Sequence, residues 1–389
     1  MIYRFQAVAG NHMERKISDE RFTITYRLSG SEPEALAAAK DICIEQTVEF
    51  PEELITDEFI RDNIFGRIES FTAEEGGSRF RADISFAVET SAFEFTQFLN
   101  VIFGNISLKP GIVIEDINLP PEFSKRFPGP RFGVSGLRNI LNVYDRPLIA
   151  SAIKPMGMTS VQFATLATEF TKGGIDIIKD DHGLSDQPFS RFRERAASCS
   201  HAVNDVNAKH GGKTLYFPNI TAPSDQIIDR AFFAKEQGAG GVLISPAITG
   251  FDIMKHLADD NNFTLPVMSH PAFIGPYLTG ASGFTHGALL GKLMRIAGAD
   301  MVVYPNFGGR FSFTKDECAD IVNGCRNEFG SIKSIFPSPG GGMNFSNIPE
   351  MTSFYGKDVI YLMGGGLFKR SSDLAANCRE LLQLVSVKK

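Results

Sequence analysis

Eight short apolar runs decide the fold of this 389-residue chain, and the first two are RPLIASAIKP (146–155) and GIDIIKDD (174–181). The other six are TLYFPNIT (214–221), GGVLISPA (240–247), LPVMSHPA (265–272), DMVVYP (300–305), KSIFPSP (333–339) and DVIYLMGGG (358–366). After most of them comes a run with helical periodicity, such as SDQIIDRAFFAKEQG or SSDLAANCRELLQLV. Eight β–α units over roughly 240 residues match a TIM barrel, whereas a doubly wound sheet usually has fewer strands. The pattern therefore predicts an eight-fold (β/α) barrel from about Arg146 onward.

The N-terminal part of the chain has a different pattern. Residues 22–28 and 79–88 alternate apolar and polar side chains, which is typical of half-buried strands. Residues 34–47 and 94–103 have the spacing of helices. Strands and helices mixed in this way predict an α+β domain of the ferredoxin-like type.

A segment rich in proline and glycine separates the two patterns. Its sequence is NLPPEFSKRFPGPRFGV, at residues 118–134, and it cannot hold regular structure for long. The whole chain is also longer than one hydrophobic core normally serves. We therefore predict an N-terminal α+β domain over residues 1–125 and a catalytic barrel domain over residues 126–389.

The composition favours a small molecule as the partner. The formal net charge is −6 and the Lys and Arg residues are scattered, so no basic face points to nucleic acid or to a membrane. The five cysteines are odd in number and form no CxxC pair, which suits reduced thiols. The sequence contains neither the apolar core of a signal peptide nor a run of about 18 apolar residues. We expect a cytoplasmic protein.

Polar side chains gather where the predicted barrel strands end, which is where enzymes of this fold place their catalytic groups. The residues concerned are Lys154, Lys179, Asp180, Asp181, His182, Asn219 and His270. The seventh and eighth strands run into glycine triplets, at residues 340–342 and 364–366. The loops after these strands are the usual phosphate site of a barrel, because their backbone N–H groups face the anion. A phosphorylated ligand is therefore expected.

The segment KDDH, at residues 179–182, carries the most informative charges. Side chains alternate along a strand, so Lys179 and Asp181 point into the same barrel mouth. One interpretation is a buried ion pair without a catalytic role. The other is a site for a hard divalent metal, which prefers oxygen ligands and can use a lysine only after conversion to a carbamate. The residues by themselves leave both interpretations open.

The same segment resembles the carbamylated-lysine metal motif of the RuBisCO large-subunit superfamily. The likeness extends over nearly the whole chain, in the order and at nearly the spacing of that family. The matching segments are FGNISLKPGIVIEDINLPPEF, FPGPRFGV, YDRPLIASAIKP, DQPFSRFRER, PNITAP and LMGGG. Motifs of this length make a chance match negligible.

The resemblance implies a metal centre. It implies that Lys179 carries CO₂ as a carbamate and binds one Mg²⁺ per site together with Asp181 and His182. It also implies that Lys154 is an acid/base group at the reacting carbons, and that His270 lies beside the substrate.

The resemblance further implies how the substrate is held and how the subunits assemble. The phosphate is expected at four glycines of the two triplets, which are Gly341, Gly342, Gly364 and Gly365. Glu45 and Asn105 are expected to reach the active site of a partner subunit from the N-terminal domain. The protein is thus expected to be at least a homodimer with its active sites at the interface.

Several positions depart from the carbon-fixing pattern. KDDH replaces KDDE, so the third metal ligand becomes an imidazole, and Mn²⁺ becomes an alternative to Mg²⁺. Pro271 stands where an arginine grips a phosphate, while Ile274 and Val303 replace histidines. Arg310 stands where carboxylases place the lysine that polarises CO₂, and we expect it to grip an anionic group of the substrate.

These departures predict a RuBisCO-like protein of the non-carboxylating form IV branch. The expected reaction is metal-assisted enolisation of a phosphorylated ketose, such as a methylthio-sugar phosphate, by an isomerase or enolase. One alternative is a decarboxylase or a transcarboxylase/hydrolase of a 3-oxo sugar-acid phosphate of the 3-oxo-isoapionate 4-phosphate type. Another is a degenerate, non-catalytic scaffold.

Overall fold

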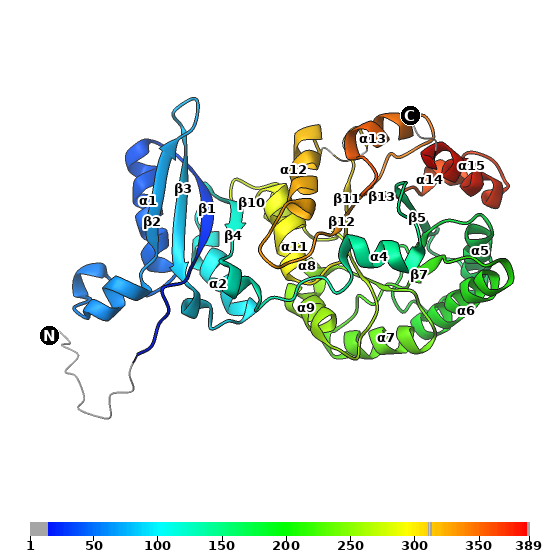
Figure 1. Cartoon of the computed structure of the whole chain (residues 1–389), viewed down its shortest axis with the longest axis horizontal. Helices are drawn as coiled ribbons and strands as arrows, with labels where there is room; N and C mark the ends of the chain where they lie inside the picture. Colours follow the sequence, from blue (N-terminus) through cyan, green and yellow to red (C-terminus); the bar gives the residue numbers. More distant parts are fainter. Residues whose placement is uncertain (1–14, 310, 312, 387–389) are drawn as a thin grey trace.

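Two β-sheets organise the molecule. The structure, a computed structural model, describes residues 15–309, 311 and 313–386. One sheet has five strands in the order β10-β4-β1-β3-β2, and the other has eight strands in the order β7-β6-β5-β13-β12-β11-β9-β8. Figure 1 shows the five-stranded sheet beside the barrel, with α6, α7 and α9 along the lower edge of the barrel and α4 across its middle. Within the described residues, no helix is both long and apolar enough to cross a bilayer.

The five-stranded sheet is built almost wholly from the N-terminal part of the chain. Its elements are β1 (Arg21–Ser29), α1 (Glu32–Glu45), η1 (Glu52–Leu54), η2 (Ile60–Ile64), β2 (Arg67–Ala73), β3 (Arg79–Ala87), η3 (Val88–Ser91), α2 (Phe95–Phe103), η4 (Asn105–Leu108) and β4 (Ile112–Asn118). Along β1 the alternate residues Phe22, Ile24, Tyr26 and Leu28 are fully or almost fully buried. A capping box at Ser31 begins α1. The predicted α+β pattern is confirmed.

The eight-stranded sheet is a closed parallel barrel. Its strands are β5 (Leu148–Ile153), β6 (Ile177–Asp180), β7 (Leu215–Phe217), β8 (Val242–Ile244), β9 (Val267–Ser269), β11 (Met301–Pro305), β12 (Phe336–Gly340) and β13 (Ile360–Leu362). A parallel bridge between Asn219 and Leu243 joins β7 to β8 and closes the ring. Seven of these strands lie within the runs identified in the sequence and β12 extends one residue beyond its run, so the predicted barrel is confirmed.

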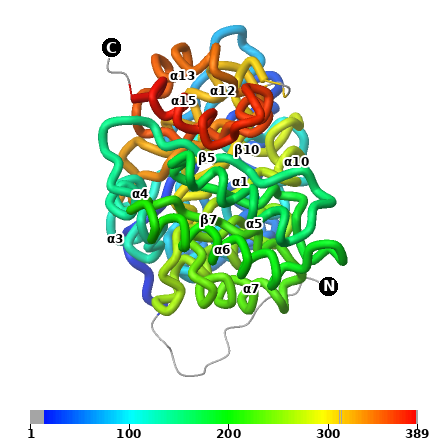
Figure 2. Tube along the Cα trace, turned by 90° about the vertical axis from the view of Figure 1, so that its right-hand side faces the viewer, coloured from blue at the N-terminus to red at the C-terminus, as the bar shows by residue number. Residues whose placement is uncertain are grey.

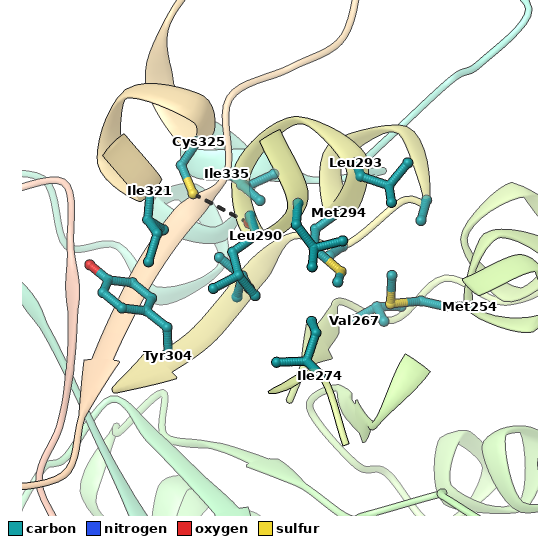
Figure 3. Packing of buried hydrophobic residues seen from close by; sticks show 14 of the residues in the cluster. Met254, Val267, Ile274, Leu290, Leu293, Met294, Tyr304, Ile321, Cys325 and Ile335 are labelled. Atoms are coloured by element: carbon teal, nitrogen blue, oxygen red, sulfur yellow. Dashed lines mark hydrogen bonds between the residues drawn. The ribbon is translucent and has the colours of Figure 1, made fainter. Parts of the chain in front are cut away.

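Helices surround the barrel on its outer side. They are α5 (Ser160–Lys172), α6 (Phe192–His210), α7 (Ser224–Glu236), α8 (Pro246–Thr249), α9 (Phe251–Asp259), α10 (Gly275–Leu278), η5 (Gly287–Leu293), α11 (Met294–Ile296), α12 (Lys315–Arg326), α13 (Ile348–Tyr355), α14 (Gly365–Phe368) and α15 (Leu374–Ser386). Figure 2 looks onto α5, α6 and α7 from the side away from the N-terminal sheet. Figure 3 shows how apolar side chains such as Met254, Val267 and Leu290 fill the space between strands and helices.

The proline- and glycine-rich segment is more ordered than the sequence suggested. It contains α3 (Pro121–Ser124), and α4 (Gly133–Leu141) begins at its end. Leu137 and Leu141 of α4 belong to the same buried cluster as the barrel-lining residues Leu148 and Phe217. The segment is therefore packed onto the barrel rather than acting as a free linker. The domain boundary after residue 125 stays a prediction.

A short strand from the C-terminal part of the chain pairs with the N-terminal sheet. The short strand β10 (Gly283–Phe284) leaves the barrel segment after β9 and pairs in parallel with β4. Ser282 strengthens the junction, because its Oγ donates to Lys109 O at 2.8 Å. The strand β10 could not be predicted from sequence, because two residues are too few to produce a periodic pattern.

Candidate active site

A cavity of about 740 Å³ opens at the C-terminal ends of the barrel strands. Its lining includes Lys154, Lys179, Asp181, His182, His270, Pro271, Ile274, Leu278, Val303, Phe313, residues 340–342, Asn344, residues 364–366 and Lys369. The structure thus brings together the predicted lysines, histidines and aspartate with both glycine triplets. A cavity at this end of a (β/α)8 barrel is the usual place for an active site.

The strand β6 separates its charged side chains as alternation requires. Lys179 and Asp181 line the cavity, and the ammonium of Lys179 donates to Asp180 O at 2.9 Å. The ion pair of Asp181 forms with Lys154, whose Nζ lies 3.7 Å from Asp181 Oδ1. Lys179 and Asp181 therefore do not form an ion pair with each other.

Asp180 points to the other side of β6, into a fully buried network. Its carboxylate accepts from Arg195 Nε at 3.0 Å, from Tyr216 OH at 2.6 Å and from the backbone N–H of Asn219 at 3.0 Å. Asn219 in turn donates through Nδ2 to His182 O at 2.9 Å and to Leu184 O at 2.8 Å. The network fixes both the end of β6 and the loop that carries His182.

The environment changes the proton affinity of both charged groups on β6. Burial lowers the pKa of Lys179 to about 8; the charge of Asp181 opposes this change and that of Lys154 supports it. Burial alone would raise the pKa of Asp181, but His182 and the two lysines outweigh it and hold that pKa below its ordinary value. Asp181 is therefore ionised at neutral pH, and a fraction of Lys179 is the neutral amine, the form that can react with CO₂.

Two histidines stack at the edge of the cavity. The rings of His182 and His270 lie 4.4 Å apart and are nearly parallel, with an interplanar angle of 10°. His270 Nδ1 accepts from the backbone N–H of Ala272 at 3.2 Å. Burial, together with the charge of Lys179, lowers the pKa of His270 well below its usual value. The lowered pKa favours the neutral imidazole, and because Nδ1 accepts a hydrogen bond, the ring proton of that form is on Nε2.

The residues at the end of β6 provide two donors for a metal. His182 Nδ1 lies 3.6 Å from Asp181 Oδ1. Within the described part of the chain, no group of three or more His, Cys, Asp or Glu side chains could hold an ion. A complete ligand set from these side chains thus requires a third donor, and Lys179 lines the same cavity beside Asp181. Converted to a carbamate, Lys179 would supply the missing oxygen, so the residues fit a divalent metal on that condition.

Closely packed glycine loops also line the cavity. A side chain at Gly342 would place its Cβ 2.7 Å from the Cα of Gly309, and the backbone at Gly342 has φ +89°. A Cβ at Gly364 would lie 3.3 to 3.4 Å from the end of Lys154. Bare backbone in both loops therefore faces the cavity directly, as a phosphate site requires.

Five residues from the segment after β9, from β11 and from the segment after β11 form an apolar wall of the cavity. Its members are Pro271, Ile274, Leu278, Val303 and Phe313. Ile274 also reaches the buried cluster drawn in Figure 3, so this wall is continuous with the core. Pro271, Ile274 and Val303, which the sequence comparison placed at positions of phosphate-binding or substrate-binding residues, are thus part of an apolar surface.

Two predicted site residues do not line this cavity, and a third lies outside the residues that the structure describes. Glu45 and Asn105 lie together, with Asn105 Nδ2 donating to Glu45 Oε1 at 3.0 Å, but neither is among the lining residues. Arg310 lies outside the described residues.

Two residues that the sequence analysis did not identify, Lys369 and Asn344, line the cavity. Asn344 is two residues after the first glycine triplet and Lys369 is three residues after the second, and this position was the signal that could have identified them.

The fold and the cavity define a (β/α)8-barrel enzyme with a basic, metal-compatible side and a glycine-rich side. The chain belongs to the RuBisCO large-chain family, because residues 133–383 match the model of the ribulose bisphosphate carboxylase large chain, catalytic domain. The resemblance seen in the sequence is confirmed.

Its relatives include proteins that bear other names than RuBisCO. The chain is 36% identical to 5-methylthioribulose-1-phosphate isomerase of Rhodospirillum rubrum, over 90% of this chain and 92% of the relative. It is 32% identical to 2,3-diketo-5-methylthiopentyl-1-phosphate enolase of Bacillus pumilus, over 78% of this chain and 76% of the relative. The crystal structure of a Rubisco-like protein from Rhodopseudomonas palustris has a TM-score of 0.85 and 36% identity, covering 95% of this chain and 98% of that one.

Proposed function

We propose that this protein is a RuBisCO-like enzyme that enolises or isomerises a singly phosphorylated ketose and does not fix CO₂. The observation that carries the proposal is the combination of three kinds of lining in one cavity. Lys154, Lys179 and Asp181, both glycine loops and a set of apolar side chains all line it. The names of the relatives agree with this combination, because both substrates have one phosphate and a methylthio group.

The apolar wall favours a substrate whose second end is uncharged. A phosphate pressed against Ile274, Leu278 and Val303 would lose its hydration without gaining a hydrogen-bond donor from them. A thioether or a short alkyl group loses little and gains contact area there. We therefore infer a methylthio-sugar phosphate, or a ketose monophosphate of similar shape, as the substrate.

We also propose that the site works with one divalent metal, Mg²⁺ or Mn²⁺, held by carbamylated Lys179, Asp181 and His182. When bound, such an ion supplies the positive charge that polarises a ketone and stabilises the enediolate. The closeness of Asp181 and His182, and the buried amine of Lys179 beside them, support this assignment. The imidazole of His182 is the reason for including Mn²⁺.

The side chains of the chain itself then have distinct tasks. The glycine loops bind the phosphate through backbone N–H groups and fix one end of the substrate. Lys154 lies between the two sides, close to Asp181 and to Gly364, and is positioned to move the proton at the reacting carbon. His270 is a second group that can accept or return a proton. Arg310 remains our candidate for gripping an anionic substrate group.

Isotope exchange tests the proposal directly. The purified protein is incubated in D₂O with Mg²⁺, bicarbonate and either 5-methylthioribulose 1-phosphate or 2,3-diketo-5-methylthiopentyl 1-phosphate. We expect deuterium to enter the carbon next to the carbonyl, and we expect no labelled CO₂ to be fixed onto ribulose 1,5-bisphosphate. Release of CO₂ from a 3-oxo sugar-acid phosphate would instead favour the lyase. Absence of exchange with every ketose phosphate would leave the scaffold interpretation.

We propose further that the enzyme is a homodimer whose Glu45 and Asn105 complete the site of the partner. Their mutual hydrogen bond and their absence from the lining of the cavity in their own chain support this. We place the protein in the cytoplasm, which agrees with five cysteines that are all buried free thiols.

A further inference from the structure

Three lysines line the cavity, and the ammonium groups of two of them already have a partner in the protein. Lys154 pairs with Asp181, and Lys179 donates to a backbone carbonyl next to the same aspartate. The third is Lys369, which directly follows α14. The helix α14 begins within the second glycine triplet, so Lys369 is three residues beyond that triplet. Among the residues that the structure describes, no carboxylate lies within 4.0 Å of its ammonium, and the side chain is exposed. One cation at the glycine side of the cavity is therefore left for a ligand.

The neighbouring cation, Arg370, differs from Lys369 because it already has a carboxylate partner. Arg370 is bound to Glu380, with Nε 2.9 Å from Oε2, and its guanidinium lies 5.1 Å from the ring centroid of Phe345. Its charge is therefore neutralised outside the cavity. Lys369 and Arg370 are adjacent in sequence, yet only Lys369 lines the cavity with an uncompensated charge.

We propose that Lys369 binds the phosphate of the substrate, holding it against the glycine loops as a charged partner to their backbone N–H groups. Backbone N–H groups provide direction but no net charge, whereas a lysine ammonium acts as a point charge on a phosphate. Lys369 is the lysine of the lining whose ammonium has neither an ion pair nor a hydrogen bond within the described residues. The inference rests on the proposed function, because it names the residue that neutralises the single phosphate which that function requires.

Two variants and one control test this role. Lys369→Gln removes the charge, Lys369→Arg keeps it, and Lys209→Gln removes a charge from the exposed end of α6 at the opposite end of the barrel. Binding of inorganic phosphate is followed by ³¹P NMR without any substrate, and kcat and KM are measured with the ketose phosphate. For Lys369→Gln we expect about tenfold weaker phosphate binding and about tenfold higher KM, the loss of one charge-assisted hydrogen bond, with kcat nearly unchanged. Lys369→Arg restores most of the affinity, and Lys209→Gln changes neither quantity.

The two measurements separate this inference from the proposed function. Equal phosphate affinity in Lys369→Gln and the unaltered protein overturns the role of Lys369, as does a loss of kcat at constant KM. If phosphate binding depends on Lys369 but no ketose phosphate reacts, the residue assignment stands and the proposed reaction fails. If the unaltered protein binds no phosphate at all, both are contradicted. Because Lys369 is exposed, its replacement leaves the core intact, and an unchanged melting temperature confirms folding.

Discussion

Single residues on β6 show how alternation distributes different tasks along one strand. Lys179 and Asp181 face the cavity, whereas Asp180 between them faces Arg195 and Tyr216. The first half of this arrangement could be predicted, because strand periodicity depends only on neighbouring residues. The second half could not, because Tyr216 lies 36 residues away in sequence and its approach depends on the closed barrel.

Replacing Lys179 tests the metal centre. We expect Lys179→Ala to lose turnover and to lose binding of Mn²⁺, because the variant has no amine to carry the carbamate. Electron paramagnetic resonance measures free and bound Mn²⁺ without requiring activity, and circular dichroism checks the fold. Full activity in this variant would contradict the assignment of Lys179 as a metal ligand.

Replacing Asp180 tests the buried network behind the strand. Both side chains of the Asp180–Arg195 pair are 0% exposed. Asp180→Ala leaves a buried guanidinium without its carboxylate, so we expect the free energy of unfolding to fall by about 3–5 kcal/mol. Asp229→Ala is the matched control, because it breaks the exposed pair between Asp229 of α7 and Arg193, which is on α6 like Arg195, and should cost at most about 1 kcal/mol. Urea denaturation compares the two, and equal losses would argue against the network.

At the scale of elements, the sequence predicted regular repeats well and short irregular pieces poorly. The eight barrel strands could be found because each is a buried apolar run followed by a helical pattern. The strand β10 could not, since it consists of Gly283 and Phe284 and its partner β4 lies about 170 residues earlier. The segment between β9 and β10 nevertheless matters for the site, because it carries Ile274 and Leu278 of the apolar wall.

Gly283 sets the position of that segment. It has φ +141°, and a Cβ there would lie 2.2 Å from Tyr277 O in α10. We expect Gly283→Ala to lower the free energy of unfolding by about 3 kcal/mol and to raise KM, because both backbone strain and the displacement of α10 contribute. Gly76→Ala is the control, with φ +97° but nothing within 4 Å of the added Cβ, so it reports strain without a collision. The prediction is wrong if the two variants lose the same stability and keep the same KM.

At the scale of the whole molecule, the cavity of one chain contains most but not all of the predicted site. Glu45 and Asn105 are joined to each other at 3.0 Å on the N-terminal domain and are absent from the lining. Sequence resemblance predicted this separation, because it assigned both residues to the neighbouring subunit. Composition and periodicity could not have done so, since they carry no information about a second chain.

Subunit mixing tests the shared site. Asn105→Ala and Lys179→Ala damage different halves of each site, so a mixed dimer contains one site with both lesions and one intact site. We expect co-expression of the two inactive variants to restore about a quarter of the normal activity. Lys154→Ala mixed with Lys179→Ala is the control, because both lesions lie in the barrel and no intact site can form. A lack of rescue in the first mixture would contradict the shared site.

The pairing of β10 with β4 has a mechanical consequence for the proposed assembly. Thr285 N–H donates to Ile114 O at 2.8 Å, so the barrel and the N-terminal sheet share backbone hydrogen bonds rather than touching only through side chains. These hydrogen bonds hold Asn105 in a fixed position relative to the barrel of its own chain before association with a partner. Two such subunits can meet as preformed bodies, and little conformational freedom has to be surrendered on association.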